Sequence, residues 1–167
     1  MDHKERTRRR LNNMGRQKCA LLNNIKWRKI LSVLSPPDTE INRVLVSYTN
    51  DCRRFFNSIL PHKEDIAKDH IRDAGLWGSG GPVYYDEIYE IRIPFLNKDN
   101  YYYQNNFSKE EGKRVFGMLQ ELGELPIEIS DDCIIIKGYS NLSSSPKVFP
   151  DRGPIKKGSK FVKSGDD

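Results

Sequence analysis

The sequence predicts an α+β fold, in which helices pack on one face of a small antiparallel sheet between disordered basic termini. Two patterns support this: apolar residues recur at helical spacing in two segments, and β-branched or aromatic residues alternate in others. In addition, strands and helices do not alternate regularly, as a doubly wound fold would require. We therefore expect a basic arm over residues 1–16, one domain over residues 17–140 and a disordered tail over residues 141–167.

Charge is distributed unevenly along the 167 residues, although the formal net charge is only +5. Residues 1–29 contain ten Lys or Arg and two Asp or Glu, and residues 147–167 contain six and three. Residues 30–146, in contrast, contain twelve basic and eighteen acidic side chains. We therefore expect an acidic folded body with basic ends, so that each part attracts partners of the opposite charge.

The amino-terminal half predicts a helix, a strand and a shorter helix in turn. Apolar side chains at three- and four-residue spacings over residues 17–34 are typical of an amphipathic helix, which Pro36 should end. β-branched residues over residues 41–48 predict a strand. We expect a short helix around residues 52–60, followed by a solvated helix or loop over residues 61–74, where both charges mix.

The carboxyl-terminal half predicts a strand, a helix and a hairpin. The strand spans residues 83–95. Ser108 followed by Glu111 is a capping-box pattern that begins a helix, and Gly123 can end that helix in a left-handed conformation. Short β-branched runs at residues 126–130 and 133–139 then predict a hairpin with a two-residue turn, although the glycine that such turns prefer is missing.

The predicted strand over residues 83–95 joins negative charge to aromatic residues. Its apolar side would carry Tyr85 and Tyr89, which are alternatively core residues, and Glu87 breaks the alternation. Acidic and aromatic side chains together suit a basic protein surface, whereas the plainer alternative is an edge strand with a solvated face. The candidate partner-binding residues are Trp77, Tyr84, Tyr85, Asp86, Glu87, Tyr89 and Glu90.

The residue spacing in this sequence does not match that of known catalytic or cofactor sites. The glycines of residues 75–82 precede a strand and no Gly-Lys-Ser/Thr follows, so they predict a turn and not a phosphate-binding loop. Lys137 has no acid two positions before it, and Glu90 is followed by Arg92 where a metal-dependent nuclease would use lysine, so exposed salt bridges are the better interpretation. No local metal-binding spacing links Cys52, His62, Asp69 and His70. We predict no enzyme activity, no cofactor and no metal.

The cellular setting follows from the apolar content and the cysteines. No apolar run approaches the roughly 18–20 residues that cross a bilayer, and the first residues lack the apolar stretch of a secretory signal. Cys19, Cys52 and Cys133 are odd in number and widely spaced, which favours reduced thiols over a disulfide framework. We therefore expect a cytoplasmic protein with no membrane partner.

The basic arm supports a different function. Five cationic side chains there could neutralise phosphates and give salt-sensitive binding to nucleic acid: Arg8, Arg9, Arg10, Arg16 and Lys18. The plainer alternative is a solubilising tail. An acidic body would repel a nucleic-acid backbone, and no helix-turn-helix or zinc-finger pattern is present, so a nucleic-acid-associated regulator is the alternative hypothesis and not the leading one.

Two stretches resemble a small bacterial family that often lies near toxin cassettes. Residues 20–27, with an apolar pair, Asn-Asn and Lys-Trp, resemble its opening helix, and residues 115–139 resemble its closing helix, Pro-centred turn and last strand ending in Gly-Tyr. The tryptophan-rich strand of that family matches only Trp77 and the strand that begins at Tyr85. The resemblance implies an immunity protein, which binds and neutralises a cognate protein toxin, for example a nuclease with a basic groove.

Overall fold

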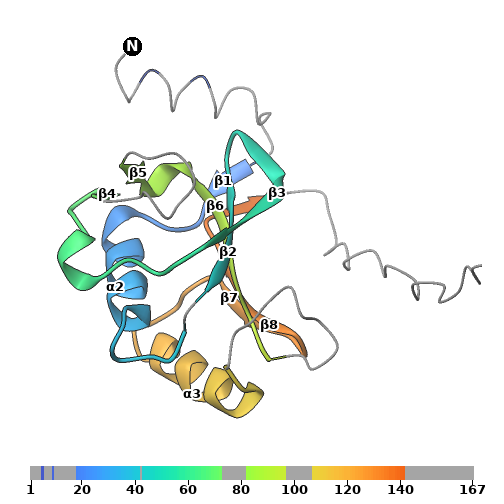
Figure 1. Cartoon of the computed structure of the whole chain (residues 1–167). Coiled ribbons are helices and arrows are strands. Elements are labelled where there is room, and N and C mark those ends of the chain that lie inside the picture. The colour runs from blue at the N-terminus through green and yellow to red at the C-terminus, as the bar shows by residue number, and fades with distance from the viewer. Residues whose placement is uncertain are drawn as a thin grey trace, which may run out of the picture.

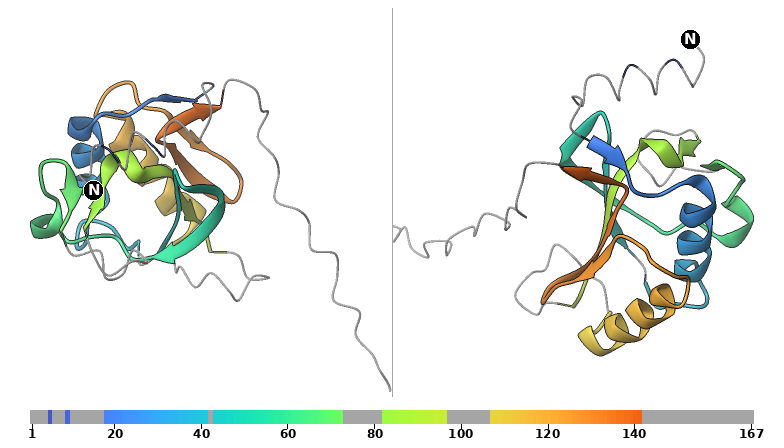
Figure 2. Two further views of the ribbon diagram at one scale, coloured as in Figure 1. Left: turned by 90° about the horizontal axis from the view of Figure 1, so that it is seen from above. Right: turned by 180° about the vertical axis from the view of Figure 1, so that it is seen from behind.

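A computed structural model describes residues 5, 9, 18–41, 43–72, 82–96 and 107–141. Its centre is an antiparallel sheet of five strands in the order β3-β2-β6-β8-β7. The strands are β2 (Val44–Tyr48), β3 (Asp51–Ser58), β6 (Ile88–Pro94), β7 (Ile127–Ile129) and β8 (Cys133–Lys137). Two helices, α2 (Asn24–Leu34) and α3 (Lys109–Gln120), cover one face of this sheet (Figures 1 and 2), which confirms the predicted fold class.

Helix α2 is shorter than its apolar pattern predicted. Its first turn is capped by Asn23, whose side chain accepts a hydrogen bond of 2.9 Å from the backbone N–H of Lys26. The residues before this cap form β1 (Lys18–Ala20), so a start at residue 17 was wrong. Ile25, expected on the apolar stripe, is 61% exposed. The helix ends at Leu34, before Pro36 as predicted, because Ser35 precedes a proline and has an extended backbone with ψ 140°.

The helix expected around residues 52–60 is wrong, because this segment forms the edge strand β3. It pairs antiparallel with β2, in a register that places Val46 opposite Phe56. The Phe56 ring also packs against the Tyr48 ring, with centroids 5.8 Å apart. Both contacts link β3 to a neighbouring strand, so they stabilise strand geometry in a segment whose own apolar spacing is ambiguous.

Helix α3 and the hairpin that follows it confirm the predictions. The Ser108 hydroxyl accepts from the Glu111 N–H at 3.1 Å, and Gly123 after the helix has a φ of 105°. In the β7–β8 hairpin, the Ser130 hydroxyl accepts from the Cys133 N–H at 3.1 Å, while the Ser130 N–H donates to the Cys133 carbonyl oxygen at 2.9 Å. The Ser130 side chain therefore closes the turn in the absence of a glycine.

The core lies between the sheet and the two helices. Its fully buried residues come from both layers, and they include Trp27, Ile30, Leu31, Leu34, Val46, Ile91, Ile93, Val115, Leu119, Ile134 and Ile136. Neither helix in the described ranges has the length and apolar content needed to cross a bilayer. Cys19 is exposed, Cys52 is half-buried and Cys133 is buried, and all three are free thiols.

A small group of elements lies beside the five-stranded sheet. The segment expected as a solvated helix or loop forms a 3-10 turn, η1 (Lys63–Asp65), and the strand β4 (His70–Ile71). Strand β4 pairs antiparallel with β5 (Val83–Tyr84), and β5 runs into the 3-10 turn η2 (Tyr85–Glu87), which contacts α2. The long strand expected over residues 83–95 is therefore interrupted, because η2 separates β5 from β6.

The two ends of the domain meet in a second small sheet. Strand β1 pairs antiparallel with β9 (Tyr139–Asn141), and the Leu21 N–H donates to the Gly138 carbonyl oxygen at 2.8 Å. The Gly138 N–H in turn donates to the Tyr89 carbonyl oxygen at 2.8 Å. The two sequence stretches at residues 20–27 and 115–139, far apart along the chain, thus pack directly against each other.

Candidate partner-binding surface

The acidic part of the expected binding strand is a tight turn and not a strand. We call residues 84–87 the acidic turn. Within it, a Glu87 carboxylate oxygen accepts a hydrogen bond of 3.2 Å from the Tyr84 backbone N–H. This bond folds the chain back on itself, which explains why Glu87 breaks the strand alternation. The side chains of Tyr84, Asp86 and Glu87 are all half-buried.

Buried tyrosines hold the acidic turn in place. The Tyr85 side chain is fully buried, and its hydroxyl donates to the Ala67 carbonyl oxygen at 2.7 Å. The Tyr139 hydroxyl donates to the Asp86 carbonyl oxygen at 2.7 Å. Tyr89, itself buried, stacks against Tyr139 with the ring planes 4° apart and the centroids 6.1 Å apart. Tyr85 and Tyr89 are therefore core residues, so their assignment as partner-binding residues is corrected.

Burial and nearby carboxylates raise the pKa values of three tyrosines in and around the acidic turn. Burial, with a smaller contribution from the nearby Asp86 carboxylate, raises the pKa of Tyr139 to about 12. Burial is also the main reason that the pKa of Tyr85 rises to about 12, with Arg28 opposing the change and Asp69 adding to it. Burial and then Glu87 raise the pKa of Tyr48. The acids of the turn thus lie within electrostatic reach of the aromatic hydroxyls.

These pKa values predict alkaline instability. The folded-state pKa of Tyr85 and of Tyr139 is raised from 10.0 to about 12, so the folded protein holds both protons more tightly than the unfolded chain. The stability that the two protonated hydroxyls contribute is complete below pH 10.0 and should be lost as the pH rises to about 12. Urea unfolding at pH values across this range measures the decline in unfolding free energy. The Tyr139→Phe variant should show a smaller decline with pH, and it should lose about 1 kcal/mol of unfolding free energy at neutral pH. An unfolding free energy that stays constant up to about pH 12 would contradict the burial of both hydroxyls.

Two further side chains flank the acidic turn. His70 lies opposite Tyr84 in the β4–β5 pair, and their rings are 5.3 Å apart at 44°. The His70 Nδ1 atom lies 2.7 Å from an Asp69 carboxylate oxygen. The Asp69 carbonyl oxygen also accepts from the N–H at the start of η2, at 3.1 Å, which joins β4 to the turn. We call the resulting surface of Asp69, His70, Tyr84, Asp86 and Glu87 the acidic corner. Sequence analysis did not identify Asp69 or His70 as part of it.

Glu90 lies apart from the acidic corner. It is only 9% exposed, and its carboxylate forms an ion pair with Arg92, which is also largely buried. The Arg92 guanidinium lies 4.4 Å from the centroid of the Phe55 ring on β3, so it reaches across the intervening strand β2. The predicted Glu90–Arg92 pair is present, but it is a buried pair and not an exposed one. We therefore remove Glu90 from the candidate binding residues.

The remaining predicted residues lie mostly outside the described part of the chain. Trp77 is one of these, and so are Arg8, Arg10 and Arg16. Arg9 is described and exposed, and its guanidinium forms an ion pair of 2.8 Å with Glu5. Lys18 contributes its backbone to β1. The expectation of disorder over residues 1–16 and 141–167 concerns residues outside the described ranges, apart from Glu5, Arg9 and Asn141. Asn141 belongs to strand β9, so the predicted start of the tail at this residue was wrong.

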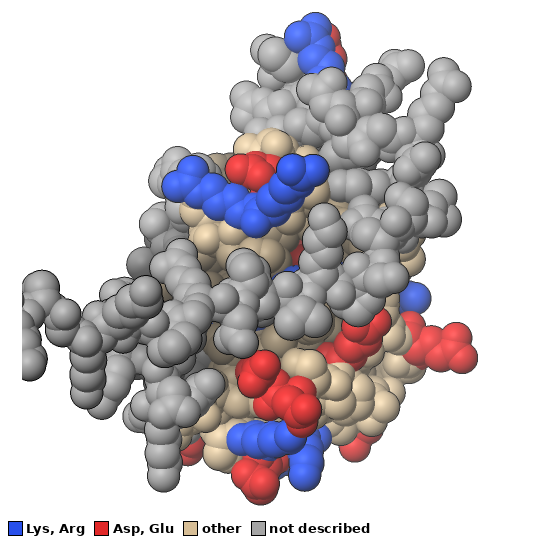
Figure 3. All heavy atoms as spheres, turned by 90° about the vertical axis from the view of Figure 1, so that its right-hand side faces the viewer, with Lys and Arg blue, Asp and Glu red and all other residues tan. Residues whose placement is uncertain are grey.

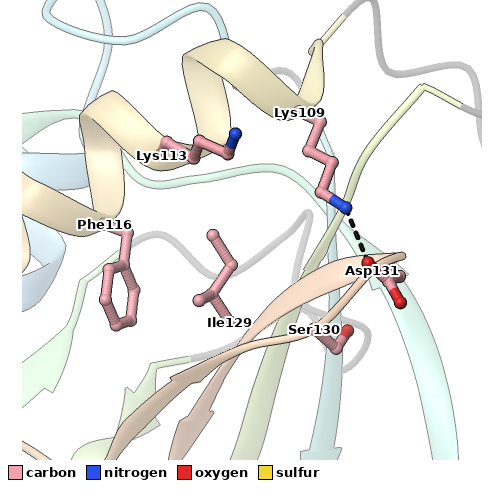
Figure 4. A pocket seen from close by; sticks show the side chains of 6 residues that line it. All are labelled: Lys109, Lys113, Phe116, Ile129, Ser130 and Asp131. Atoms are coloured by element: carbon pink, nitrogen blue, oxygen red, sulfur yellow. Dashed lines mark hydrogen bonds and ion pairs between the residues drawn. The ribbon is translucent and has the colours of Figure 1, made fainter.

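A shallow groove lies between α3 and the β7–β8 hairpin (Figure 4). Its volume is about 360 Å³, and Phe116 and Ile129 form its apolar lining. The Asp131 carboxylate in the lining pairs with the Lys109 ammonium at 2.6 Å, while Lys113 projects from α3 (Figure 4). The lining therefore holds no pair of acids that could act in general acid–base catalysis. In the described ranges, no three His, Cys, Asp or Glu side chains lie close enough together to hold a metal ion.

Comparison with known proteins identifies no similar protein. No protein-family model, no curated protein and no solved structure matches the chain.

Proposed function

We propose that the protein is an immunity protein that binds and neutralises a cognate protein toxin through the acidic corner. The observation that carries this proposal is the placement of two half-buried acidic residues, Asp86 and Glu87, on a turn fixed by the hydroxyls of Tyr85 and Tyr139. One carboxylate oxygen of Asp86 is buried, so the charge of this residue is only partly open to solvent. A surface that is already ordered loses little conformational entropy on binding. Fixed negative charge also speeds the encounter with a basic partner.

The partner that fits this surface presents Lys and Arg side chains around a groove or a convex patch. A nuclease toxin has such a surface, because its active site must attract a phosphate backbone. Asp69 extends the negative charge beside the turn, and the half-buried Tyr84 ring next to His70 supplies the aromatic contact that protein interfaces favour. The exposed free thiol of Cys19 suits a role in the reducing cytoplasm.

Neutralising the two carboxylates without changing their shape tests the proposal. The double variant Asp86→Asn/Glu87→Gln should bind the toxin about tenfold more weakly, with slower association and a weaker dependence on salt. The product of the adjacent gene is the partner to use, first by co-purification and then by surface plasmon resonance at several salt concentrations. Glu87→Gln keeps an oxygen that can accept the Tyr84 N–H bond, so the turn is preserved.

A matched control changes the same amount of charge elsewhere. Glu121 and Glu124 are exposed at the end of α3, and the variant Glu121→Gln/Glu124→Gln should bind as tightly as the wild type. Removing residues 1–16 should likewise leave toxin binding intact, whereas loss of nucleic-acid retention in that deletion would favour the alternative regulatory role. Equal affinity of the Asp86→Asn/Glu87→Gln variant and the wild type would overturn the acidic corner as the interface, and failure of the adjacent gene product to bind at all would overturn the function.

A further inference from the structure

The groove between α3 and the β7–β8 hairpin, which we call the α3–β7 groove, combines an apolar floor with a basic rim (Figure 4). Lys109, Lys113 and Phe116 line it from α3, and their spacing of four and three residues places them on one face of the helix. Ile129 lines it from the hairpin, where its side chain lies beside the Phe116 ring (Figure 4). One helix and one strand thus contribute the two walls.

The floor of the groove leaves apolar surface open to solvent. Ile129 is 37% exposed, and the half-buried Phe116 packs against the core from the other wall. The groove volume of about 360 Å³ lies near the lower end of the roughly 300–1,000 Å³ of small-molecule pockets, which enclose most of their ligand. A shallow groove of this size suits one large side chain that a partner protein presents.

The two lysines of the rim differ in their partners. The Lys109 ammonium donates to the Asp131 carboxylate at 2.6 Å, and this bond raises the pKa of Lys109. Glu110 and Asp132 make smaller contributions in the same direction. Lys113 is exposed, and within the described ranges it forms no ion pair. Lys113 is therefore the cation of the rim that can receive a carboxylate from a partner.

The charge around the groove is mixed in sign. At the lower end of the molecule, where α3 lies in Figure 1, Figure 3 shows Lys and Arg side chains with Asp and Glu side chains next to them. Glu110 and Asp132 are both exposed close to Lys109. Such a rim attracts a single carboxylate at Lys113, whereas it repels a chain of closely spaced negative charges.

We infer that the α3–β7 groove binds a segment of a partner protein in which a large apolar side chain lies two positions from a carboxylate. The apolar side chain would cover Ile129 and Phe116, and the carboxylate would pair with Lys113. In an extended segment, side chains two positions apart lie on the same side and roughly 6.6–6.8 Å apart. Lys113 and Phe116 are separated by about one helical turn, or ~5.4 Å along the axis, so both groups can be engaged at once.

Two other occupants fit less well. Nucleic acid would bring several phosphates past Glu110 and Asp132, and the half-buried Phe116 offers no open ring face on which a base could stack. A second copy of the chain would bring its own lysine rim to the groove, and like charges across an interface are unfavourable. A partner segment with one carboxylate meets neither obstacle.

This groove goes beyond the proposed toxin binding. The acidic corner belongs to β4, β5 and η2, none of which lines the groove, and it attracts basic surfaces. The groove instead selects an apolar side chain and a carboxylate. The two surfaces can therefore be tested separately in the full-length protein, with the toxin as the probe for one and a synthetic peptide as the probe for the other.

The test titrates the peptide Gly-Ser-Glu-Thr-Phe-Thr-Glu-Ser-Gly into the isotope-labelled full-length protein and follows the amide signals by NMR. Its Glu residues stand two positions before and after Phe, so one of them meets Lys113 in either chain direction. Amide signals of residues 109–116 and 129–131 should shift. The Lys113→Glu variant should bind at least about fivefold more weakly, because an attractive pair becomes repulsive, and Lys113→Gln should show a smaller loss. Ile129→Ser should weaken binding about fivefold through lost apolar contact.

Matched controls lie on the other helix. Lys29→Glu and Ile25→Ser change an exposed lysine and an exposed isoleucine of α2, and both variants should bind the peptide normally. A peptide with Gln in place of Glu should bind about fivefold more weakly, and one with Ala in place of Phe at least about tenfold. Thermal unfolding checks that every variant folds. The Asp86→Asn/Glu87→Gln variant should bind the peptide as the wild type does, which keeps failure of this inference distinct from failure of the toxin proposal.

Several outcomes would overturn the inference. Equal binding of the Glu and Gln peptides would remove the role of charge, and equal binding of the Phe and Ala peptides would remove the apolar anchor. No shift at about 1 mM peptide, or shifts confined to other segments, would remove the groove as the site. If Lys113→Glu instead abolishes binding of an oligonucleotide or a concentration-dependent dimer while the peptide never binds, the groove serves nucleic acid or a second copy and the inference is wrong.

Discussion

The Gly138→Ala variant is expected to lose about 3 kcal/mol or more of unfolding free energy, a large fraction of the total for a domain of this size. A methyl group at this position would lie 2.4 Å from the Ile88 carbonyl oxygen and 3.0 Å from the Tyr89 carbonyl oxygen. Both are backbone atoms of β6, the central strand of the sheet, so neither can rotate away. The hydrogen bond from the Gly138 N–H to the Tyr89 carbonyl oxygen also fixes the separation between Gly138 and strand β6.

Urea denaturation of the purified variant measures this loss, and Gly117→Ala is its control. Gly117 lies within α3, and a methyl group there would meet nothing within 4 Å. Alanine in a helix interior is favoured over glycine, so Gly117→Ala should raise the unfolding free energy by about 0.5–1 kcal/mol. If Gly138→Ala were as stable as the wild type, the close packing of β8, β9 and β6 described above would be wrong.

The Trp27→Ala variant is expected to lose about 3–5 kcal/mol. Trp27 is 1% exposed and is the largest fully buried side chain of the core, and its ring lies beside Gly138, 3.0 Å from the position that a methyl group would take. Removing the ring opens a cavity between α2 and the sheet, because the adjacent backbone is held by the sheet hydrogen bonds and cannot move in to fill it.

The matched control for this variant lies on the same helix. Ile25 is 61% exposed, so Ile25→Ala should change the unfolding free energy by less than about 0.5 kcal/mol. Thermal and urea unfolding of both variants compare the two faces of α2 directly. Equal losses in the two variants would mean that α2 does not bury Trp27 against the sheet.

The parts of the fold that were predicted correctly are those with local signals. Helix α3 begins at a Ser108 cap and ends before a glycine with positive φ, and both signals lie within a few residues of the helix. The hairpin around Ser130 is local in the same way. Strand β3 was missed because its stability comes from pairing with β2 and from the ring contact between Tyr48 and Phe56, which the spacing of its own residues does not encode.

The candidate site was predicted only in part, for a related reason. The alternation that placed Tyr85 and Tyr89 on an apolar side was informative, and both are buried. The interruption at Glu87 was visible in the sequence, but its cause is a bond from its carboxylate to the backbone of Tyr84, which no pattern specifies. Asp69 joins the acidic corner through two-residue strands, which are too short to give a periodic signal.

The pairing of β1 with β9 determines how the folded unit responds to mechanical tension. Lys18 pairs directly with Asn141, so the chain enters and leaves the domain at neighbouring points. A pulling force applied at Lys18 and Asn141 would therefore break the three residue pairs one after another, in an unzipping geometry, and would not load all three pairs at once. Strands β1 and β9 should thus separate at low force, before the five-stranded sheet unfolds.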